Sequence, residues 1–566
     1  MYKLQDVYLK PIKGNEQIEN MYYRGNDKLC FVLDKDGASL VEKDSFFETF
    51  TYFGSLSVEK WSKYTFASKF YLVLKIEGSF DITLFGHYVE HDAIKKEFYG
   101  NYRYDNSTAS EVVIPYPISL NSQVVAFSVT ARSDLKIYES YYSADLEKNS
   151  FSNPFVSLVT TTFKKEKYIK RNILLLKEEL FYTSEFKNRF NWFVIDNGRT
   201  LEESSDGCIS VIHNKNVGGA GGFARGMIEA LKQKRKPSHI LLMDDDVNVN
   251  SDSFKRVYRL LNILRDEYKN YFISGAMLNL DAPNIQHENT GVIKDEGFCV
   301  PLQSGRDLRL WDQVVLNESI NDSITNRYAA WWFCCIPTTV ARLDNLPLPL
   351  FVRGDDIEYS IRNHARFITM NGISIWHQGF AGKSNPVMDL YQSKRNELII
   401  NAIRPELSEV KSFRFIEELF WQEIYKFNYD GANLISDAIE DFMKGPEWLV
   451  SNDLFEQIQL KRDSQSKTYP ITNEIHGQID YSQLFTHRKI SRIKKFIYDY
   501  SFNGQARIPS LLLRKKTGVI PYSGGYYPDK QLLTSTNIAV DVANDRYALF
   551  KRNRSKFKTS KNDFYL

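Results

Sequence analysis

The chain has 566 residues, of which 43% are hydrophobic and 25% are charged, and its formal net charge is +3. This balance is typical of a globular protein of about three domains and gives no reason to expect a nucleic-acid partner. The five cysteines show no C-x-x-C spacing, so we do not expect a disulfide framework. We expect instead that the protein resides in a reducing compartment. With no apolar run of transmembrane length and no secretory signal pattern, we expect a cytoplasmic protein.

Residues 1–150 are predicted to form a β-sandwich domain. Short runs rich in aromatic and β-branched residues, at 70–76, 80–85 and 124–130, are separated by Gly, Asp and Asn. Residues 151–154 are interpreted as a linker to the next domain.

Residues 151–385 are predicted to form an α/β domain. Strands are expected at 155–161, 192–195, 209–213 and 240–243, with helices at 166–180 and 222–232. This alternation favours a mostly parallel sheet with helices on both faces. Ligands bind beyond the carboxyl ends of such strands, so Asp196, a Gly-rich turn and Asp244–Asp246 are expected to share one cleft.

Residues 386–566 are predicted to form a mainly helical domain, with helices at 387–402, 413–427 and 432–443. Residues 488–500 have the pattern of a basic amphipathic helix. Such a helix favours peripheral, salt-reversible attachment to the anionic inner face of a plasma membrane. The alternative is an ordinary helix that packs on its own domain.

Asp244, Asp245 and Asp246 directly follow the apolar run 239–243. Adjacent carboxylates repel one another, so the cluster needs a cation or a solvated turn. In an extended chain Asp244 and Asp246 point the same way and can bind one metal ion. His377, at the end of the predicted strand 372–376, is a third ligand of suitable type, although a lone His is more often structural. Oxygen ligands with one imidazole suit Mn²⁺ or Mg²⁺.

The Gly-rich segment 216–226 lies between a predicted strand and a helix. It allows close approach of an anion to the backbone at a helix N-terminus. Gly219-x-Gly221-x-x-Ala224, with Asp244 about 20 residues further on, also fits a dinucleotide fingerprint and hence an NAD(P) oxidoreductase. Against that reading, the strand does not run straight into the first glycine, and the fingerprint needs one acid rather than three. A tight turn without a ligand is the remaining alternative.

Two further clusters follow. Trp331 and Trp332 suit either core packing or stacking on a sugar, and in a strand only one of them easily lines a cleft. Asp355 and Asp356, with Glu358, open a helix after Gly354, where they either cap the helix or provide a general base for an acceptor hydroxyl. Cations at the start of the next helix, Lys394 and Arg395, suit either phosphate contact or a solvated face.

In this order the motifs resemble inverting family-2 glycosyltransferases with a GT-A fold, and more closely bacterial galactofuranosyltransferases of the mycobacterial galactan-polymerising type. The segments that carry the resemblance are 161–163, 195–198, 216–226, 244–246, 331–332, 355–359 and 376–377.

The resemblance implies Asp244, Asp246 and His377 as metal ligands, Asp356 as the catalytic base and Asp355 as its acidic neighbour. It implies donor contacts from Thr161, Lys165, Asp196, Asn216, Gly219, Gly221, Arg225 and Asp245. It implies acceptor contacts from Trp331, Trp332 and Glu358.

The implied activity is inverting, metal-dependent transfer of galactofuranose from UDP-galactofuranose to a glycan acceptor, expected to be lipid-linked, in bacterial surface polysaccharide synthesis. A homo-oligomeric state of the protein is also compatible with this activity. The alternatives are a dTDP-rhamnose-dependent rhamnosyltransferase, an NAD(P) oxidoreductase and a non-catalytic glycan-binding protein. Lys164–Lys165 stand where the family often has Arg, and Gly354 where the mycobacterial enzymes have Trp. A single-linkage enzyme is therefore as plausible as a polymerase.

Overall fold

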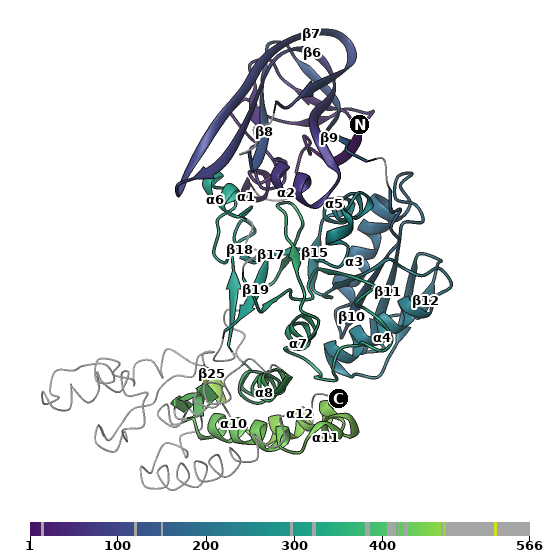
Figure 1. Ribbon diagram of the computed structural model, residues 1–566, viewed down its shortest axis with the longest axis vertical. Helices are drawn as coiled ribbons and strands as arrows, with labels where there is room; N and C mark the ends of the chain where they lie inside the picture. Colours follow the sequence, from purple (N-terminus) through teal and green to yellow (C-terminus); the bar gives the residue numbers. More distant parts are fainter. Residues whose placement is uncertain are drawn as a thin grey trace, which may run out of the picture.

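The computed structural model describes residues 1–465, except 13–15, 118–121, 149–150, 295–297, 320–323, 380–384, 404–414, 417, 421 and 424–427, together with 468–470 and 526–528. An antiparallel sheet lies at the top of Figure 1, an α/β region in the middle and a group of helices at the bottom. The predicted basic helix 488–500 lies outside the described residues.

The N-terminal part is a nine-stranded antiparallel sheet of order β2-β5-β8-β6-β9-β4-β3, with β1 on β9 and β7 on β6. Its strands are β1 (Tyr2–Asp6), β2 (Arg24–Gly25), β3 (Val32–Leu33), β4 (Ser39–Val41), β5 (Phe46–Glu48), β6 (Ala67–Glu90), β7 (Ala93–Pro115), β8 (Val124–Ala131) and β9 (Leu135–Leu146), with helices α1 (Glu16–Glu19) and α2 (Val58–Tyr64). The prediction that residues 1–150 are rich in β-strands is confirmed. The strands form one hydrogen-bonded sheet, because β6 pairs with β9 along its first half and with β8 along its second.

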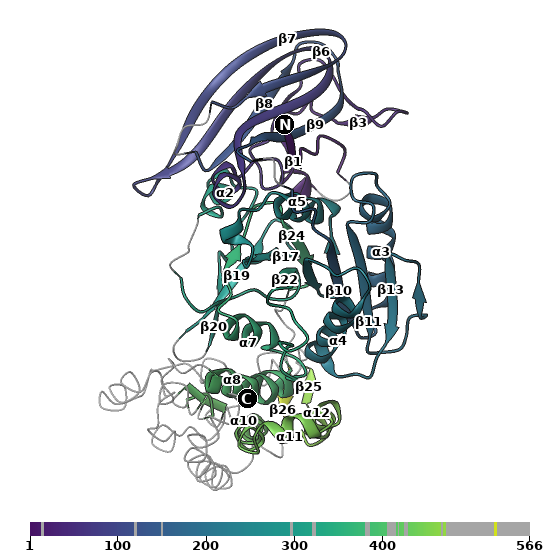
Figure 2. The same cartoon turned by 45° about the vertical axis from the view of Figure 1, so that its right-hand side comes forward.

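The strands predicted separately at 70–76 and 80–85 are one continuous strand, β6. Gly78, expected to break the run, has a φ of +115°. The register of β6 against β7 shifts between Ile76 and Gly78. A glycine at positive φ accommodates a bulge and lets the strand continue, so it bends the β6–β7 hairpin that arches over the domain in Figure 2.

The central part is a mixed α/β region, which confirms the predicted class. Its eight-stranded sheet has the order β12-β13-β11-β10-β14-β22-β16-β23, in which β13, β11, β10 and β14 are parallel and β14, β22 and β16 are antiparallel. These strands are β10 (Val156–Thr162), β11 (Phe190–Asp196), β12 (Ser204–Ser205), β13 (Ile209–His213), β14 (His239–Met243), β16 (Phe272–Ser274), β22 (Cys334–Pro337) and β23 (Phe367–Ile368). The helical elements are α3 (Glu166–Leu176), η1 (Lys177–Phe181), α4 (Gly218–Lys232), α5 (Ser251–Asn262), η2 (Asp266–Tyr268), α6 (Trp311–Leu316) and α7 (Asp355–Arg362).

Two smaller sheets complete this region. One has the order β15-β24-β17-β18 and the other β20-β19-β21. Their strands are β15 (Val247–Val249), β17 (Ala276–Asn279), β18 (Gln286–Glu288), β19 (Thr290–Ile293), β20 (Cys299–Leu302), β21 (Arg327–Tyr328) and β24 (Ser374–His377). The β15–β24 pairing brings chain segments that are distant in sequence to the end of β14.

The glycines of the 216–226 segment lie inside α4. The helix begins at Gly218 rather than at Gly222 as predicted. A Cβ at Gly222 would overlap the side chain of Thr161, and one at Gly226 would overlap Val159. These two glycines therefore let α4 pack closely on β10, and this close packing outweighs the low helix propensity of glycine.

Helix α5 joins the N-terminal sheet to the α/β region through buried arginines. Arg259 is 2% exposed and lies 2.8 Å from the carboxylates of both Asp6 on β1 and Glu185. Its neighbour Arg256 donates to Gln5 and to the carbonyl of Phe53. The two parts thus share a charged, hydrogen-bonded interface.

We expect Arg259→Met to lower the thermal stability of the chain markedly. Removing one partner of a buried ion pair costs about 3–5 kcal/mol, and because both carboxylates here are partly exposed we expect the lower end of that range. Arg265→Met is the matched control, since its pair with Glu147 is more exposed and such pairs contribute about 0–1 kcal/mol. Equal melting temperatures of the two variants would contradict the interface role.

The C-terminal part is helical as far as it is described. It comprises η3 (Val387–Gln392), α8 (Ser393–Ile403), α10 (Tyr429–Phe442), α11 (Pro446–Ser451) and α12 (Leu454–Asp463), with the short strands β25 (Thr468–Pro470) and β26 (Tyr526–Pro528). The helices predicted at 387–402 and 432–443 are confirmed, and 413–427 is only partly described. Among the described residues, none of the helices combines the length and the apolar character that crossing a membrane requires.

Candidate functional site

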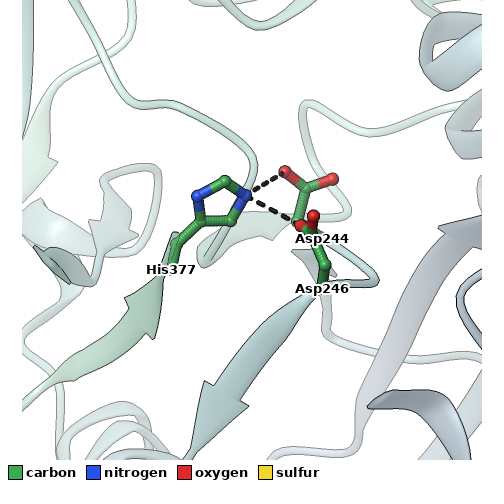
Figure 3. A group of neighbouring side chains, drawn as sticks. All are labelled: Asp244, Asp246 and His377. Atoms are coloured by element: carbon green, nitrogen blue, oxygen red, sulfur yellow. Dashed lines mark ion pairs between the residues drawn. The ribbon is translucent and has the colours of Figure 1, made fainter. Parts of the chain in front are cut away.

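Three side chains converge beyond the carboxyl end of β14. Nε2 of His377 lies 2.8 Å from Oδ1 of Asp246 and 3.8 Å from Oδ2 of Asp244 (Figure 3). One potential ligand atom from each residue lies within 4.8 Å of the others. The register explains the meeting, because Val247, which follows Asp246, pairs with His377 across β15 and β24.

The two carboxylates converge for a different reason from the one predicted. Asp244–Asp246 do not extend the strand but form a bend between β14 and β15. The bend turns Asp244 and Asp246 toward the same imidazole, and strand alternation is not involved.

The three adjacent aspartates differ in the direction in which their pKa values are shifted. Burial, together with the nearby carboxylates of Asp246 and Asp356, raises the pKa of Asp244 to about 6, although the charge of His377 opposes the rise. Burial and the charge of Asp244 likewise raise the pKa of Asp245. Burial also acts to raise the pKa of Asp246, but its hydrogen bonds and charge interactions with His377 and Lys165 outweigh burial and lower that pKa strongly.

These residues fit a divalent cation. Two carboxylates and one imidazole are a ligand set that suits Mn²⁺ or Mg²⁺, and added positive charge would relieve the repulsion that raises the pKa of Asp244. Nδ1 of His377 lies 2.7 Å from the carbonyl oxygen of Gln378, to which it can donate. That hydrogen bond orients the ring and directs Nε2 toward the carboxylates, as is usual for a metal-binding histidine.

Of the residues predicted to contact the sugar donor, only some lie near the Asp244–Asp246–His377 cluster. Nζ of Lys165 lies 2.8 Å from Oδ2 of Asp246, and Oδ2 of Asp245 accepts a hydrogen bond from the backbone N–H of Phe163 at 3.0 Å. Thr161 is 8% exposed and contacts α4 near Gly222. Lys165 and Asp245 therefore lie beside the cation-ligand cluster, and Thr161 lies where β10 packs on α4.

Asp196 has a structural role in this arrangement. It is fully buried, and its carboxylate accepts hydrogen bonds from the backbone N–H groups of Gly198, Thr200 and Leu201 at 2.7–2.9 Å. These bonds hold the loop after β11, so the carboxylate points into that loop.

The remaining donor candidates lie on or beside α4. Asn216 accepts a hydrogen bond from the backbone N–H of Gly218, and Arg225 is ion-paired with Glu229 at 2.6 Å. A Cβ on Gly219 would lie 3.7 Å from Oδ2 of Asp355, whereas Gly221 faces the side chain of Val217. The Gly-rich start of α4 therefore lies close to the carboxylate of Asp355.

Asp355 and Asp356 begin α7. Asp355 is 8% exposed, and burial together with the charge of Asp356 raises its pKa well above the usual range. Burial also raises the pKa of Asp356 to about 6, against the effect of hydrogen bonds from backbone N–H groups. Because Asp356 also raises the pKa of Asp244, the two acidic clusters share one electrostatic environment.

Glu358, also on α7, is paired with a basic residue of the same helix. It is 1% exposed, and its carboxylate pairs with Arg362.

The two tryptophans lie in a turn rather than in a strand. Trp331 is 4% exposed and packs edge-on against Phe223 and Tyr359, with ring centroids 5.3 Å and 5.8 Å away. Trp332 is half-buried beside His287 at 6.1 Å. Trp331 therefore belongs to the core, and Trp332 is the one with partly exposed ring surface.

Glu288 on β18 is a residue that the sequence reasoning missed. It is 3% exposed, and burial together with the charge of Asp356 raises its pKa to about 8. The sequence signal was a His-Glu pair, His287–Glu288, inside a short strand. Its relation to Asp356 depends on the packing of separate sheets and not on sequence spacing.

No protein-family model matches the chain. Galactofuranosyltransferase GlfT2 of Mycobacterium tuberculosis is 29% identical to it over 260 residues, which is 43% of this chain and 40% of that protein. The GlfT2 of Mycolicibacterium smegmatis is 29% identical over 256 residues, 42% of this chain and 38% of that protein. The chain thus matches less than half the length of these curated relatives.

Among solved structures, the chain is similar to the CBM22-1–GH10 modules of Clostridium thermocellum xylanase 10B, at 9% identity over 35% of this chain and 38% of that one, with a TM-score of 0.19. A family 22 carbohydrate-binding module of the same xylanase matches 25% of this chain and 94% of its own at 11% identity, with a TM-score of 0.18. Scores this low support no inference about fold or function.

Proposed function

We propose that the protein transfers galactofuranose from UDP-galactofuranose to a hydroxyl group of a glycan acceptor, with inversion at the anomeric carbon. The observation that carries the proposal is the convergence of Asp244, Asp246 and His377 with the buried acids Asp355 and Asp356. The identity to two proteins named galactofuranosyltransferase supports the choice of sugar. The same proposal includes a lipid-linked acceptor in bacterial surface polysaccharide synthesis. It also includes peripheral attachment of the protein to an anionic membrane surface through residues 488–500.

Each side chain has a role in this reaction. Asp244, Asp246 and His377 would hold a divalent cation, and its positive charge would stabilise the departing diphosphate. Lys165, next to Asp246, adds a second positive charge on the donor side. Asp356 accepts the proton of the acceptor hydroxyl, which makes that oxygen nucleophilic as it attacks the face opposite the leaving group. Asp355 is the acidic neighbour of this base, and its own pKa is raised by burial and by the charge of Asp356.

The pH dependence of the proposed transfer follows from Asp356. Its pKa is raised to about 6, and only the ionised carboxylate accepts a proton. We expect turnover at saturating substrate to fall as pH drops through about 6 and to reach a plateau above it. Initial rates from pH 5 to 8 at constant ionic strength measure this, and a flat profile across that range would exclude Asp356 as the base.

An NAD(P) oxidoreductase is the alternative from a different class. The dinucleotide fingerprint would use Asp244 to bind a ribose, but that carboxylate faces His377 and Asp246. The structure therefore favours a role for Asp244 in cation binding.

Calorimetry separates these functions. We expect UDP to bind in the presence of Mn²⁺ and to bind weakly or not at all with excess chelator, while NADH and NADPH show no heat of binding. UDP-galactofuranose and dTDP-rhamnose in the same titration distinguish the two sugar donors. Tight, metal-independent binding of NADH without UDP binding would reverse the assignment.

A further inference from the structure

The segment that leads into Asp355 and Asp356, Leu350–Gly354, has an unfavourable backbone conformation. Phe351 has a φ of +71°, Arg353 +70° and Gly354 +87°. A left-handed conformation is unfavourable for a residue other than glycine, because its Cβ comes too close to the following carbonyl oxygen. Such residues persist where the surrounding structure holds them in place, and they are frequent next to functional groups.

Three buried polar side chains hold this segment from one side. Gln392, at the end of η3, and Arg395 and Asn396, on α8, are each at most 1% exposed. Gln392 donates to the carbonyls of Leu350 at 2.5 Å and Val352 at 3.1 Å. Asn396 donates to the carbonyls of Val352 at 2.9 Å and Arg353 at 2.6 Å, and Arg395 donates to that of Leu350 at 3.3 Å.

These contacts exclude both interpretations of Arg395, the solvated face and the phosphate contact. Arg395 is buried against a backbone carbonyl and the side chains of Tyr391 and Asn396. It lies neither on a solvated face nor in a position to meet a phosphate.

The start of α4 holds the segment from the other side. The backbone N–H of Ala220 donates to the carbonyl of Phe351 at 3.0 Å. Gly218, with a φ of +71°, has no room for a Cβ because the Phe351 carbonyl occupies that space. The segment is therefore fixed between α8 and the Gly-rich helix start.

We propose that Gln392 and Asn396 are positioning residues for Asp355 and Asp356. They act through the backbone of Leu350–Gly354, whose next residues are the two acids at the start of α7. In this way the helical C-terminal region completes the site in the α/β region. The inference rests on the proposed function for its effect on turnover, whereas the effect on the backbone stands independently of it.

Fixed hydrogen-bond donors satisfy the carbonyls of Leu350, Val352 and Arg353 in this one conformation. Without the donors the segment relaxes toward ordinary φ values, and the N-terminus of α7 moves with it. A displacement of about 1 Å at a reacting group is enough to reduce a rate by about 100-fold.

The test compares Asn396→Leu and Gln392→Met, which keep side-chain volume and remove the donors, with Asn401→Leu. Asn401 is 5% exposed on the same helix α8, and no hydrogen bond joins its side chain to the Leu350–Gly354 segment among the described contacts. All three changes place an apolar side chain at a buried polar position, so a general loss of stability affects them alike.

Amide hydrogen exchange and steady-state kinetics are measured on the full chain. We expect the amides of residues 350–358 to exchange faster in Asn396→Leu and Gln392→Met, and turnover to fall by about 10- to 100-fold. Donor KM and the affinity for UDP with Mn²⁺ should stay within about twofold of the wild type, because the cation-binding side chains are not displaced. Asn401→Leu should show neither the local exchange nor the selective loss of turnover.

Two outcomes would overturn the inference. One is that exchange and turnover in Asn396→Leu and Gln392→Met equal those of Asn401→Leu. The other is that turnover and UDP affinity fall in parallel in all three variants. If wild type transfers no galactofuranose but the local exchange still rises in the two test variants alone, the proposed function fails and the positioning of the two acids by Gln392 and Asn396 stands.

Discussion

Asp246→Ala is expected to abolish sugar transfer and to leave the fold intact. The substitution removes the carboxylate closest to Nε2 of His377 and so one of three cation ligands. Mutation of groups that merely orient metal ligands already costs about 10- to 100-fold, so loss of a ligand should exceed that. The fold should tolerate the change, because removing one of the adjacent carboxylates also relieves the repulsion that raises the pKa of Asp244.

Transfer rates, UDP calorimetry with Mn²⁺ and melting curves test this prediction together. Asp206→Ala is the matched control, since Asp206 is also paired with a lysine, Lys177, and also has a lowered pKa, but it lies near the edge strand β12. The control should keep wild-type transfer. Full activity of Asp246→Ala, or of the wild type in excess chelator, would refute the metal-dependent reaction.

Asp356→Asn is expected to retain donor and cation binding but to lose turnover. The amide keeps the size of the side chain and cannot accept the proton of the acceptor hydroxyl. General base catalysis contributes about 10²- to 10⁴-fold, and we expect a loss of that size. The cation ligands come from other elements, β14 to β15 and β24, so affinity for UDP with Mn²⁺ should change little.

Glu358→Gln controls for the loss of negative charge at the start of α7. Its side chain is buried against Arg362, so neutralising it tests the helix dipole and packing without removing a cation ligand or Asp356. We expect near-normal turnover in this control. If Asp356→Asn keeps more than about a tenth of wild-type turnover, the base is another group, and Asp355 is the next to test.

Several local features could be read from the sequence because their causes are local. Hydrophobic runs followed by acids or glycines predicted β10, β11, β13 and β14 within one or two residues of their observed bounds. The same patterns predicted that Asp244–Asp246 and the Gly-rich segment follow strand ends. The predicted boundaries were wrong where glycine can either end an element or lie inside it. Gly78 bends β6 instead of ending it, and the glycines of the Gly-rich segment pack inside α4.

The partners of the acidic residues were decided by tertiary structure. His377 reaches Asp246 because β24 pairs with β15, a register that no spacing of residues encodes. Asp196 follows a strand end as expected, yet its carboxylate is taken up by its own loop, because a buried acid must be satisfied by the nearest donors.

The sequence by itself determined the class of the fold, the ends of the strands that carry charge, and which acids are candidates for chemistry, since hydrophobic periodicity and turn residues act over a few neighbours. Only the tertiary structure decided that Trp331 is core, that Glu288 joins the electrostatic environment of Asp356, and that Gln392 and Asn396 hold the backbone before Asp355. These outcomes depend on contacts between separate elements, and burial, pKa and hydrogen-bond partners are properties of those contacts rather than of any single segment.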